Sequence, residues 1–161
     1  MRKLILIIIL SIFASNLGAM EMSTKGIDSL IKKHEGLALK SYKCLSGKHY
    51  LIGYGNIAKP NQRITKQKAE IKLRSRLPKY EKMVNDKIKI PLTQGQFDCL
   101  TDLSFNLGHL PNKIVKYVNN YDFNNAIKII YSYHHCNKKD VKSLKKRRLA
   151  DINSFCQVSI I

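Results

Sequence analysis

Glu35 is the acidic residue whose surroundings best suit acid–base chemistry. Ile27, Leu30 and Ile31 precede it at helical spacing, and Gly36, a residue typical of helix C-caps, follows it directly. The negative end of a helix dipole and apolar neighbours both disfavour an ionised carboxylate. A carboxyl group that keeps its proton near neutral pH can act as a general acid. The alternative is an ordinary surface glutamate in the last turn of a helix.

The residues around Glu35 predict a helix followed by a small β-hairpin. Thr24 is expected to be the N-cap of that helix. Further along, Ser46-Gly47 and Gly53-Tyr54-Gly55 enclose an apolar run, so turn residues bound a β-rich segment. We therefore expect a hairpin over Tyr42–Ile57.

The rest of the chain predicts helices separated by Pro and Gly. Thr65 opens a helix that Pro78 interrupts. Thr93 and Gln96 form a capping box for a helix that ends at Gly108, and apolar residues almost all around it are typical of a central, buried helix. Further apolar stripes predict helices over residues 114–118, 123–131 and 144–155. The expected fold class is α+β, a single domain with one hairpin followed by five or six helices.

The first 19 residues are expected to be a secretory signal peptide. A positive start, Met1-Arg2-Lys3, precedes the apolar run Leu4–Phe13 and the stretch Ala14–Ala19. The run is short for a membrane span, so we expect cleavage after Ala19, with an uncleaved N-terminal anchor as the alternative. The mature domain is then residues 20–161, and it is expected to be secreted or periplasmic.

The composition describes a folded and strongly basic chain. The 161 residues are 44% hydrophobic and carry a formal net charge of +18, which falls to +16 without Arg2 and Lys3. The apolar fraction excludes a disordered basic tail. Such a charge favours a polyanionic partner, namely cell wall, lipid headgroups, lipopolysaccharide or nucleic acid. No RNP-like or groove-reading motif is present, so no nucleic-acid partner is expected.

Four cysteines lie in the expected mature domain: Cys44, Cys99, Cys136 and Cys156. An oxidising compartment allows three pairings among them. The sequence has no CxxC pair, so it predicts neither a zinc site nor another metal or cofactor. Cys99 falls on the expected buried helix, where cysteine behaves as a small hydrophobic residue and is expected to be unpaired.

Three ordered segments carry the most specific pattern in the chain. Residues 35–44 read EGLALKSYKC, and Gly47 and Ile52-Gly53-Tyr54-Gly55 follow them. Residues 91–100 read PLTQGQFDCL and run on to Phe105-Asn106-Leu107-Gly108, and residues 144–150 read LKKRRLA. Together the segments resemble the phage-type lysozymes (endolysins, glycoside hydrolase family 24) over most of the mature domain. The resemblance implies a lysozyme-like fold, with a small N-terminal lobe that contains a β-hairpin and a mainly helical C-terminal lobe.

The resemblance also implies an activity. Phage-type lysozymes are muramidases, which hydrolyse the β-1,4 bond between N-acetylmuramic acid and N-acetylglucosamine in peptidoglycan. The family pattern is a Glu, then an Asp or Cys nine residues later, then a Thr directly before the Ile-Gly of the hairpin. Glu35 and Cys44 match the first two positions. Leu51 stands where the Thr is expected, after a loop that is one residue longer.

Leu51 cannot activate water, so another group must assist Glu35. Cys44, as a thiolate, could orient a water molecule or stabilise the oxocarbenium-like transition state, and its alternative role is a disulfide. His49 lies two residues before Leu51, on the same face of an extended strand, and is a substitute base. Its alternative is an exposed position in the hairpin.

Further site residues are implied by the same resemblance. In the family an arginine of the basic C-terminal helix pairs with the catalytic Glu, and Arg147 or Arg148 falls at that position. Asn106 is expected to line the cleft, with a contact at the helix C-cap as its alternative. Tyr54, Arg147 and Arg148 are expected to bind substrate beside it.

The leading interpretation is a monomeric muramidase whose basic charge holds it on the anionic cell wall. No membrane span is expected once the signal peptide is removed. The alternative is a lysozyme-fold protein that binds peptidoglycan and lost catalysis when the Thr was replaced. Residues 48–51 distinguish the two interpretations.

Overall fold

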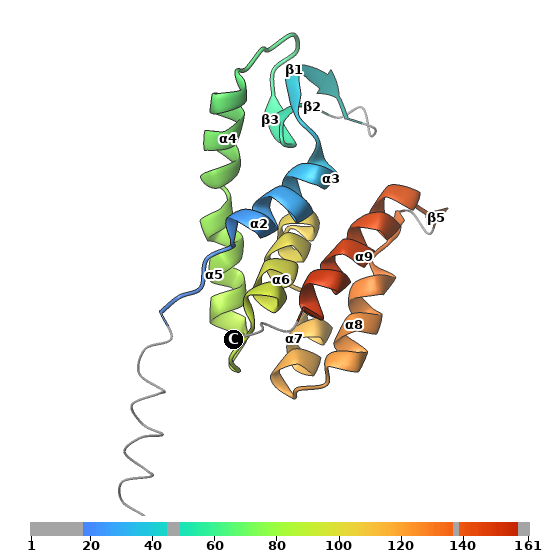
Figure 1. Cartoon of the computed structure of the whole chain (residues 1–161). Coiled ribbons are helices and arrows are strands. Elements are labelled where there is room, and N and C mark those ends of the chain that lie inside the picture. Colours follow the sequence, from blue (N-terminus) through green and yellow to red (C-terminus); the bar gives the residue numbers. More distant parts are fainter. Residues whose placement is uncertain (1–17, 45–48, 137–138, 158–161) are drawn as a thin grey trace, which may run out of the picture.

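The computed structural model describes residues 18–44, 49–136 and 139–157. A small antiparallel sheet lies at one end of the molecule, and helices form the larger remainder (Figure 1). This confirms the α+β fold with a small N-terminal lobe and a mainly helical C-terminal lobe. Most of the expected signal peptide, residues 1–17, lies outside the described residues.

One continuous helical segment leads towards the sheet. It consists of α2 (Thr24–Gly26), the π-helical η1 (Ile27–Lys32) and α3 (Lys33–Glu35). As expected, Glu35 is the last residue and Gly36 terminates the segment, with a φ of 69°. Glycine adopts this positive φ without the steric cost that a side chain brings. A π-helical turn is uncommon and often lies near a functional site.

The N-cap of this segment is Ser23, so the expectation of Thr24 is wrong by one residue. The Ser23 hydroxyl accepts a hydrogen bond from the Gly26 amide at 2.9 Å and donates to the carboxylate of Asp98. Asp98 Oδ1 also accepts from the Ser23 amide at 2.9 Å, across 75 residues of sequence. A distant acid therefore decides which of two adjacent hydroxyl residues caps the helix.

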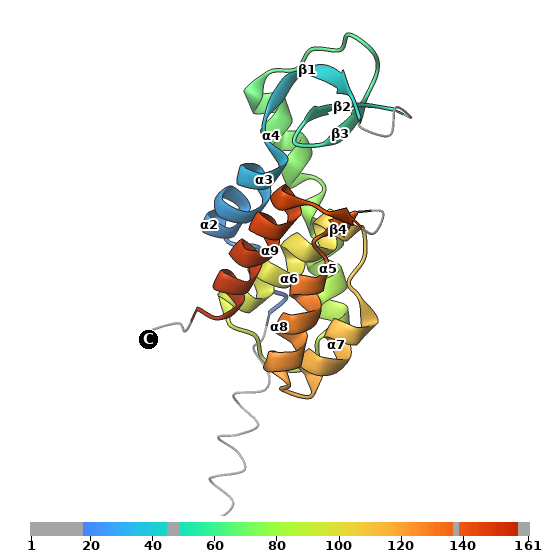
Figure 2. The same cartoon turned by 90° about the vertical axis from the view of Figure 1, so that its right-hand side faces the viewer.

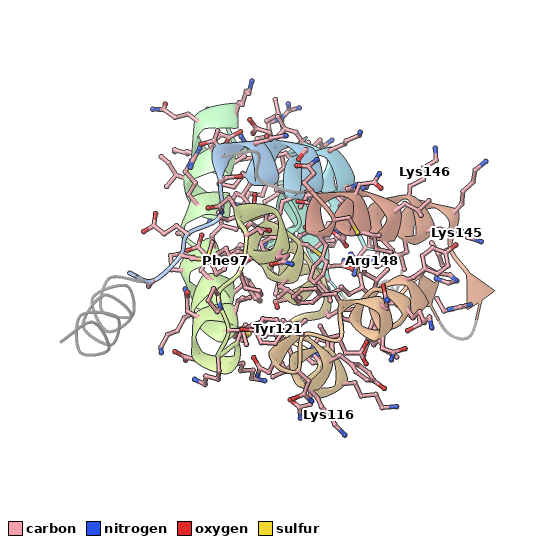
Figure 3. The ribbon with its side chains drawn as sticks, turned by 60° about the horizontal axis from the view of Figure 1, so that its bottom comes forward. Phe97, Lys116, Tyr121, Lys145, Lys146 and Arg148 are labelled. Carbon is pink, nitrogen blue, oxygen red and sulfur yellow. The ribbon has the colours of Figure 1, made fainter. Side chains whose placement is uncertain are left out.

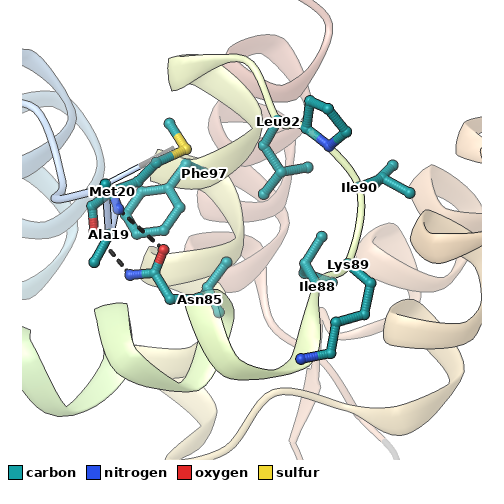
Figure 4. A pocket seen from close by; sticks show the side chains of 11 residues that line it. Ala19, Met20, Asn85, Ile88, Lys89, Ile90, Leu92 and Phe97 are labelled. Carbon is teal, nitrogen blue, oxygen red and sulfur yellow. Dashed lines mark hydrogen bonds between the residues drawn. The ribbon is translucent and has the colours of Figure 1, made fainter. Parts of the chain in front are cut away.

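The residues that precede α2 lie against α5 (Leu77–Lys87). The Met20 amide donates to Asn85 Oδ1 at 3.0 Å, and Asn85 Nδ2 donates to the Met20 carbonyl at 2.9 Å (Figure 4). The Met22 amide donates to Glu81 Oε1 at 2.9 Å. The main chain is thus held in place from the residue that follows the expected cleavage point.

The sheet contains β1 (Ala38–Lys43), β2 (Tyr50–Gly53) and β3 (Asn56–Ala58), paired antiparallel in that order. It occupies the expected hairpin region, but it has a third strand and begins at Ala38 rather than Tyr42. The register changes between Ala38↔Gly53 and Tyr42↔Leu51. Such an irregularity hides the alternating pattern by which strands are found in a sequence.

Helices α4 (Lys66–Arg74) and α5 run alongside both the sheet and the helical lobe (Figure 1). The hydroxyl of Thr65 caps α4 by accepting from the Lys68 amide at 3.2 Å. Pro78 lies in the first turn of α5, where its missing N–H costs nothing. The expected interruption at Pro78 is therefore a boundary between two helices.

The helical lobe is built around α6 (Gln94–Leu107), which lies between α5 and α9 (Figure 2). Thr93 and Gln96 form the expected capping box, and every residue from Gln96 to Phe105 is buried. The surrounding helices are α7 (Asn112–Asn119), α8 (Phe123–Ser132) and α9 (Lys142–Phe155). The central, buried helix is thus confirmed, and the described residues form six helices after the sheet, as expected.

One pair of strands was not expected from the sequence. β4 (His135–Cys136) and β5 (Lys139–Asp140) form a two-stranded antiparallel ladder between α8 and α9. Each strand is two residues long, which is too short to carry a periodic pattern.

Two cysteines sit in contrasting surroundings. Cys99 is fully buried on α6, and burial raises the pKa of its thiol well above the ordinary value. Cys156, at the end of α9, is exposed, and both residues are free thiols. The expectation that Cys99 is a buried, unpaired hydrophobic residue is confirmed.

Two kinds of feature are absent from the part of the chain that the structure describes. Among residues 18–44, 49–136 and 139–157, no helix is both long and apolar enough to cross a membrane. Within the same ranges, His, Cys, Asp and Glu side chains form no group of three or more that could hold a metal ion.

Candidate active site

Glu35 lies where the first helical segment, α9 and the β2–β3 turn meet. Its Oε1 accepts a hydrogen bond from Nη1 of Arg147 at 2.7 Å. The Glu35 side chain keeps 21% of its surface exposed, whereas Arg147 keeps 4%. The alternative of an ordinary surface glutamate is therefore wrong. Of the two arginines expected to pair with Glu35, the structure selects Arg147.

The β2–β3 turn approaches Glu35 with a residue that has no side chain. Gly55 has a φ of +74°, and a Cβ atom there would lie 3.0 Å from Oε2 of Glu35. A larger residue would be strained and would press on the carboxylate. Arg147 donates to Oε1, so Oε2 is the Glu35 oxygen that faces this turn.

Asp102 of α6 holds the other side of the Arg147 guanidinium. Arg147 Nε donates to Oδ2 of Asp102 at 3.0 Å, and Nη2 donates to Oδ1 at 2.7 Å. Burial opposes ionisation of Asp102, but the charge and hydrogen bonds of Arg147 outweigh it and lower the pKa of Asp102. Asp102 and Glu35 together raise the pKa of Arg147 in spite of its burial. Asp102 was not predicted as a site residue, although an acid on a helix expected to be buried is a signal for a buried ion pair.

Arg148 is buried and is not accessible to a ligand, so the expectation that it binds substrate is wrong. Its side chain is fully buried, with Nη2 3.0 Å from Oδ2 of Asp151 and 3.8 Å from Oδ2 of Asp102. Figure 3 shows Arg148 directed into the molecule, whereas Lys146 points away from it. Successive residues of a helix point about 100° apart, which separates the roles of Arg147 and Arg148.

Tyr54 is buried and holds the β2–β3 turn in place, and its expected contact with substrate stays a prediction. Only 4% of it is exposed. Its hydroxyl donates to Oε1 of Glu70 at 2.9 Å, and Glu70 Oε2 pairs with Lys32 at 2.7 Å. Burial, together with the hydrogen bond to Glu70, raises the pKa of Tyr54. This chain of contacts ties the β2–β3 turn to the first helical segment and to α4.

Cys44 and His49 lie opposite each other at the end of the β1–β2 pair where residues 45–48 join the two strands. The Cys44 amide donates to the His49 carbonyl at 2.9 Å. Cys44 is half-buried and His49 is exposed, and residues 45–48 between them lie outside the described residues. Leu51 pairs with Tyr42 and Ile57 on the neighbouring strands, so these three side chains share one face of the sheet. Tyr42 is 45% and Ile57 78% exposed, so that face is open to solvent.

Asn106 is half-buried on α6, one turn beyond Asp102 and on the same side of the helix. The helix ends at Gly108, which has a left-handed conformation and donates its amide to the Ser104 carbonyl at 2.8 Å. This glycine, rather than the Asn106 side chain, closes the helix. That Asn106 lines the cleft therefore stays a prediction.

Known proteins have a similar fold and a related sequence. The family model for phage lysozyme matches residues 32–151. The chain is 42% identical over 91 residues to the endolysin of Acyrthosiphon pisum secondary endosymbiont phage 1, a match that covers 55% of this chain and 61% of that protein. The fold is similar to the endolysin from Escherichia coli O157:H7 phage FAHEc1, with a TM-score of 0.78, 28% identity, and coverage of 87% of this chain and 96% of that chain.

A third similar protein is the muramidase domain of SpmX from Asticaccaulis excentricus. The TM-score is 0.75 with 27% identity, over 86% of this chain and 99% of that chain. The family match runs from the helix that carries Glu35 to the helix that carries Arg147, and so includes the whole candidate site. The chain belongs to the phage lysozyme family.

Proposed function

We propose that this chain is a muramidase that hydrolyses the β-1,4 bond between N-acetylmuramic acid and N-acetylglucosamine in peptidoglycan. The observation that carries the proposal is the Glu35 carboxyl group. It is partly exposed, held by Arg147 through one oxygen, and bordered by Gly55 at the other. Similarity to endolysins and to a muramidase domain supports the same substrate.

Glu35 is the general acid in this proposal. Its proton moves from Oε2 to the glycosidic oxygen as the bond from that oxygen to the sugar C1 breaks, and water then adds to C1. Arg147 holds Oε1, so the carboxyl group keeps one orientation during the transfer. Such preorganisation spares the enzyme from ordering the acid at the moment of reaction.

The residues expected to assist the attacking water are the unusual part of this chain. Cys44 and His49 lie where residues 45–48 join β1 to β2, and Leu51 supplies no hydroxyl to a water molecule. We assign assistance of the water to His49 or to the thiolate of Cys44. Turnover is expected to be real but weak unless His49 takes over as the base, because general-base assistance typically contributes about 10²–10⁴-fold.

The proposal is tested by adding the purified chain to a peptidoglycan suspension and measuring turbidity and released reducing ends. Loss of turbidity with new reducing ends at N-acetylmuramic acid is the expected result. Peptidoglycan that pellets the protein but releases no reducing ends, with Leu51 or with Thr at that position, would support the wall-binding alternative instead.

Two substitutions at the sheet test the missing hydroxyl. Leu51→Thr is expected to raise turnover roughly tenfold, the rate equivalent of one net hydrogen bond to the attacking water. His49→Ala is expected to lower wild-type turnover by about 10²-fold if its imidazole is the base. Leu39→Thr, also in β1–β2–β3 and 47% exposed, is the matched control and should change nothing. Full activity after His49→Ala would leave the reaction to Glu35 and Cys44.

Export completes the proposal. Residues 1–19 act as a signal peptide, and the mature chain is a monomer that its basic charge retains on the anionic wall. The bidentate contact between Asn85 and Met20 supports a fold that begins at the cleavage point. N-terminal sequencing of the exported protein should start at Met20, and a start at Met1 would indicate an uncleaved anchor.

A further inference from the structure

We propose that Asp102 is a positioning residue, which fixes the Arg147 guanidinium and thereby sets the pH range over which Glu35 can donate a proton. The proposal rests on the role of Glu35 in the proposed function. Asp102 is fully buried, so it acts through Arg147 and not on substrate.

The guanidinium group of Arg147 donates hydrogen bonds to two acids, Asp102 and Glu35. Nε and Nη2 form a fork onto both oxygens of Asp102, at 3.0 and 2.7 Å, and Nη1 donates to Glu35 at 2.7 Å. A bidentate fork is more directional than a single hydrogen bond. Asp102 therefore determines where Nη1 points, and the position of Nη1 determines which Glu35 oxygen is held.

The charges of Arg147 and Asp102 support the same role for Asp102. An arginine beside a carboxyl group favours the ionised form, which cannot act as an acid. Asp102 places a negative charge on the other side of the same guanidinium and offsets that effect at Glu35. Without Asp102, Glu35 would face an unbalanced cation and lose its proton at a lower pH.

The other charged groups around Arg147 do not replace Asp102. His34, on the segment of Glu35, has its pKa lowered by burial and then by Arg147, which favours the neutral ring. On α9, Arg148 is 3.0 Å from Asp151 and 3.8 Å from Asp102. Burial, and then the charge of Asp102, raise the pKa of Asp151 well above its ordinary value. Asp102 is thus the carboxylate that both arginines face.

Asp102→Asn is the test, because it keeps the shape and removes the charge. We expect the alkaline limb of the pH–activity profile to move to lower pH by about one unit. The ¹³C titration of the Glu35 carboxyl group should move by the same amount. Asp151→Asn, which is equally buried but does not touch Arg147, should move both curves less. Asp86→Asn, an exposed acid on α5, should move neither.

The outcomes separate the two proposals. If activity falls while the pH limb and the Glu35 titration stay in place, Asp102 is only structural and this inference is wrong. If the titration moves but no hydrolysis is seen even for the wild type, the positioning role stands and the proposed function fails. If Asp102→Asn does not fold, a measurement on the wild-type protein still tests the inference. The Asp102 carboxyl carbon must keep the chemical shift of a carboxylate throughout the Glu35 titration, and protonation in that range would overturn the inference.

Discussion

Glu35→Gln is expected to reduce peptidoglycan hydrolysis by at least about 10²–10⁴-fold, the contribution of general acid catalysis. Glutamine has the shape of glutamate but no proton to give to the glycosidic oxygen. Its amide oxygen can still accept the hydrogen bond from Nη1 of Arg147, and Asp102 still holds the guanidinium. The fold should therefore survive, and release of reducing ends from purified peptidoglycan measures the loss.

Glu21→Gln is the matched control for this substitution. Glu21 is exposed and lies before α2, so the same change of charge and shape should leave hydrolysis unaltered. Comparable activity in the wild type and in Glu35→Gln, with circular dichroism showing equal folding, would remove Glu35 from the catalytic role. Loss of folding in Glu35→Gln would mean that its pair with Arg147 is structural.

Arg148→Ala should lower the free energy of unfolding by about 3–5 kcal/mol, a typical cost of removing one partner from a buried ion pair. Arg148 is among the largest fully buried side chains of the described residues. Its loss removes the cation that lies 3.8 Å from the ionised Asp102 and 3.0 Å from Asp151, and opens a cavity between α6 and α9. Urea unfolding, followed by circular dichroism, measures the change.

Lys146→Ala is the control for Arg148→Ala. It removes a cation from the same helix at an exposed position, and such changes usually alter stability by less than about 0.5 kcal/mol. Arg148→Met combined with Asp151→Leu should recover part of the lost stability, because apolar residues of similar volume can replace a buried pair. Equal effects of Arg148→Ala and Lys146→Ala would contradict the buried position of Arg148.

Helix boundaries followed from local chemistry and could be predicted from the sequence. Gly36 and Gly108 end helices because they adopt positive φ angles, and Thr93 with Gln96 starts one through hydrogen bonds within four residues. The burial of α6 followed from the number of apolar residues around it. Each of these signals lies within one segment, so no distant partner is needed to form it.

Distant partners decided the features that could not be predicted from the sequence. Ser23 rather than Thr24 caps the first helix because Asp98 lies against Ser23. Tyr54 is buried, and its hydroxyl donates a hydrogen bond to Glu70 of α4. The change of register in β1 arises from pairing with β2, which no single strand can show. In each case the deciding contact joins residues that are remote in sequence or on different elements.

The sequence by itself determined the family, the α+β class, and Glu35 as the acid at a helix end. Only the tertiary structure decided that Arg147 and not Arg148 meets Glu35, and that Asp102 holds the same guanidinium. Two neighbouring arginines have the same chemistry, and the sequence cannot distinguish them. The packing of α9 on α6 turns Arg147 towards Glu35 and Asp102 and Arg148 towards Asp151, and this rotation assigns their roles.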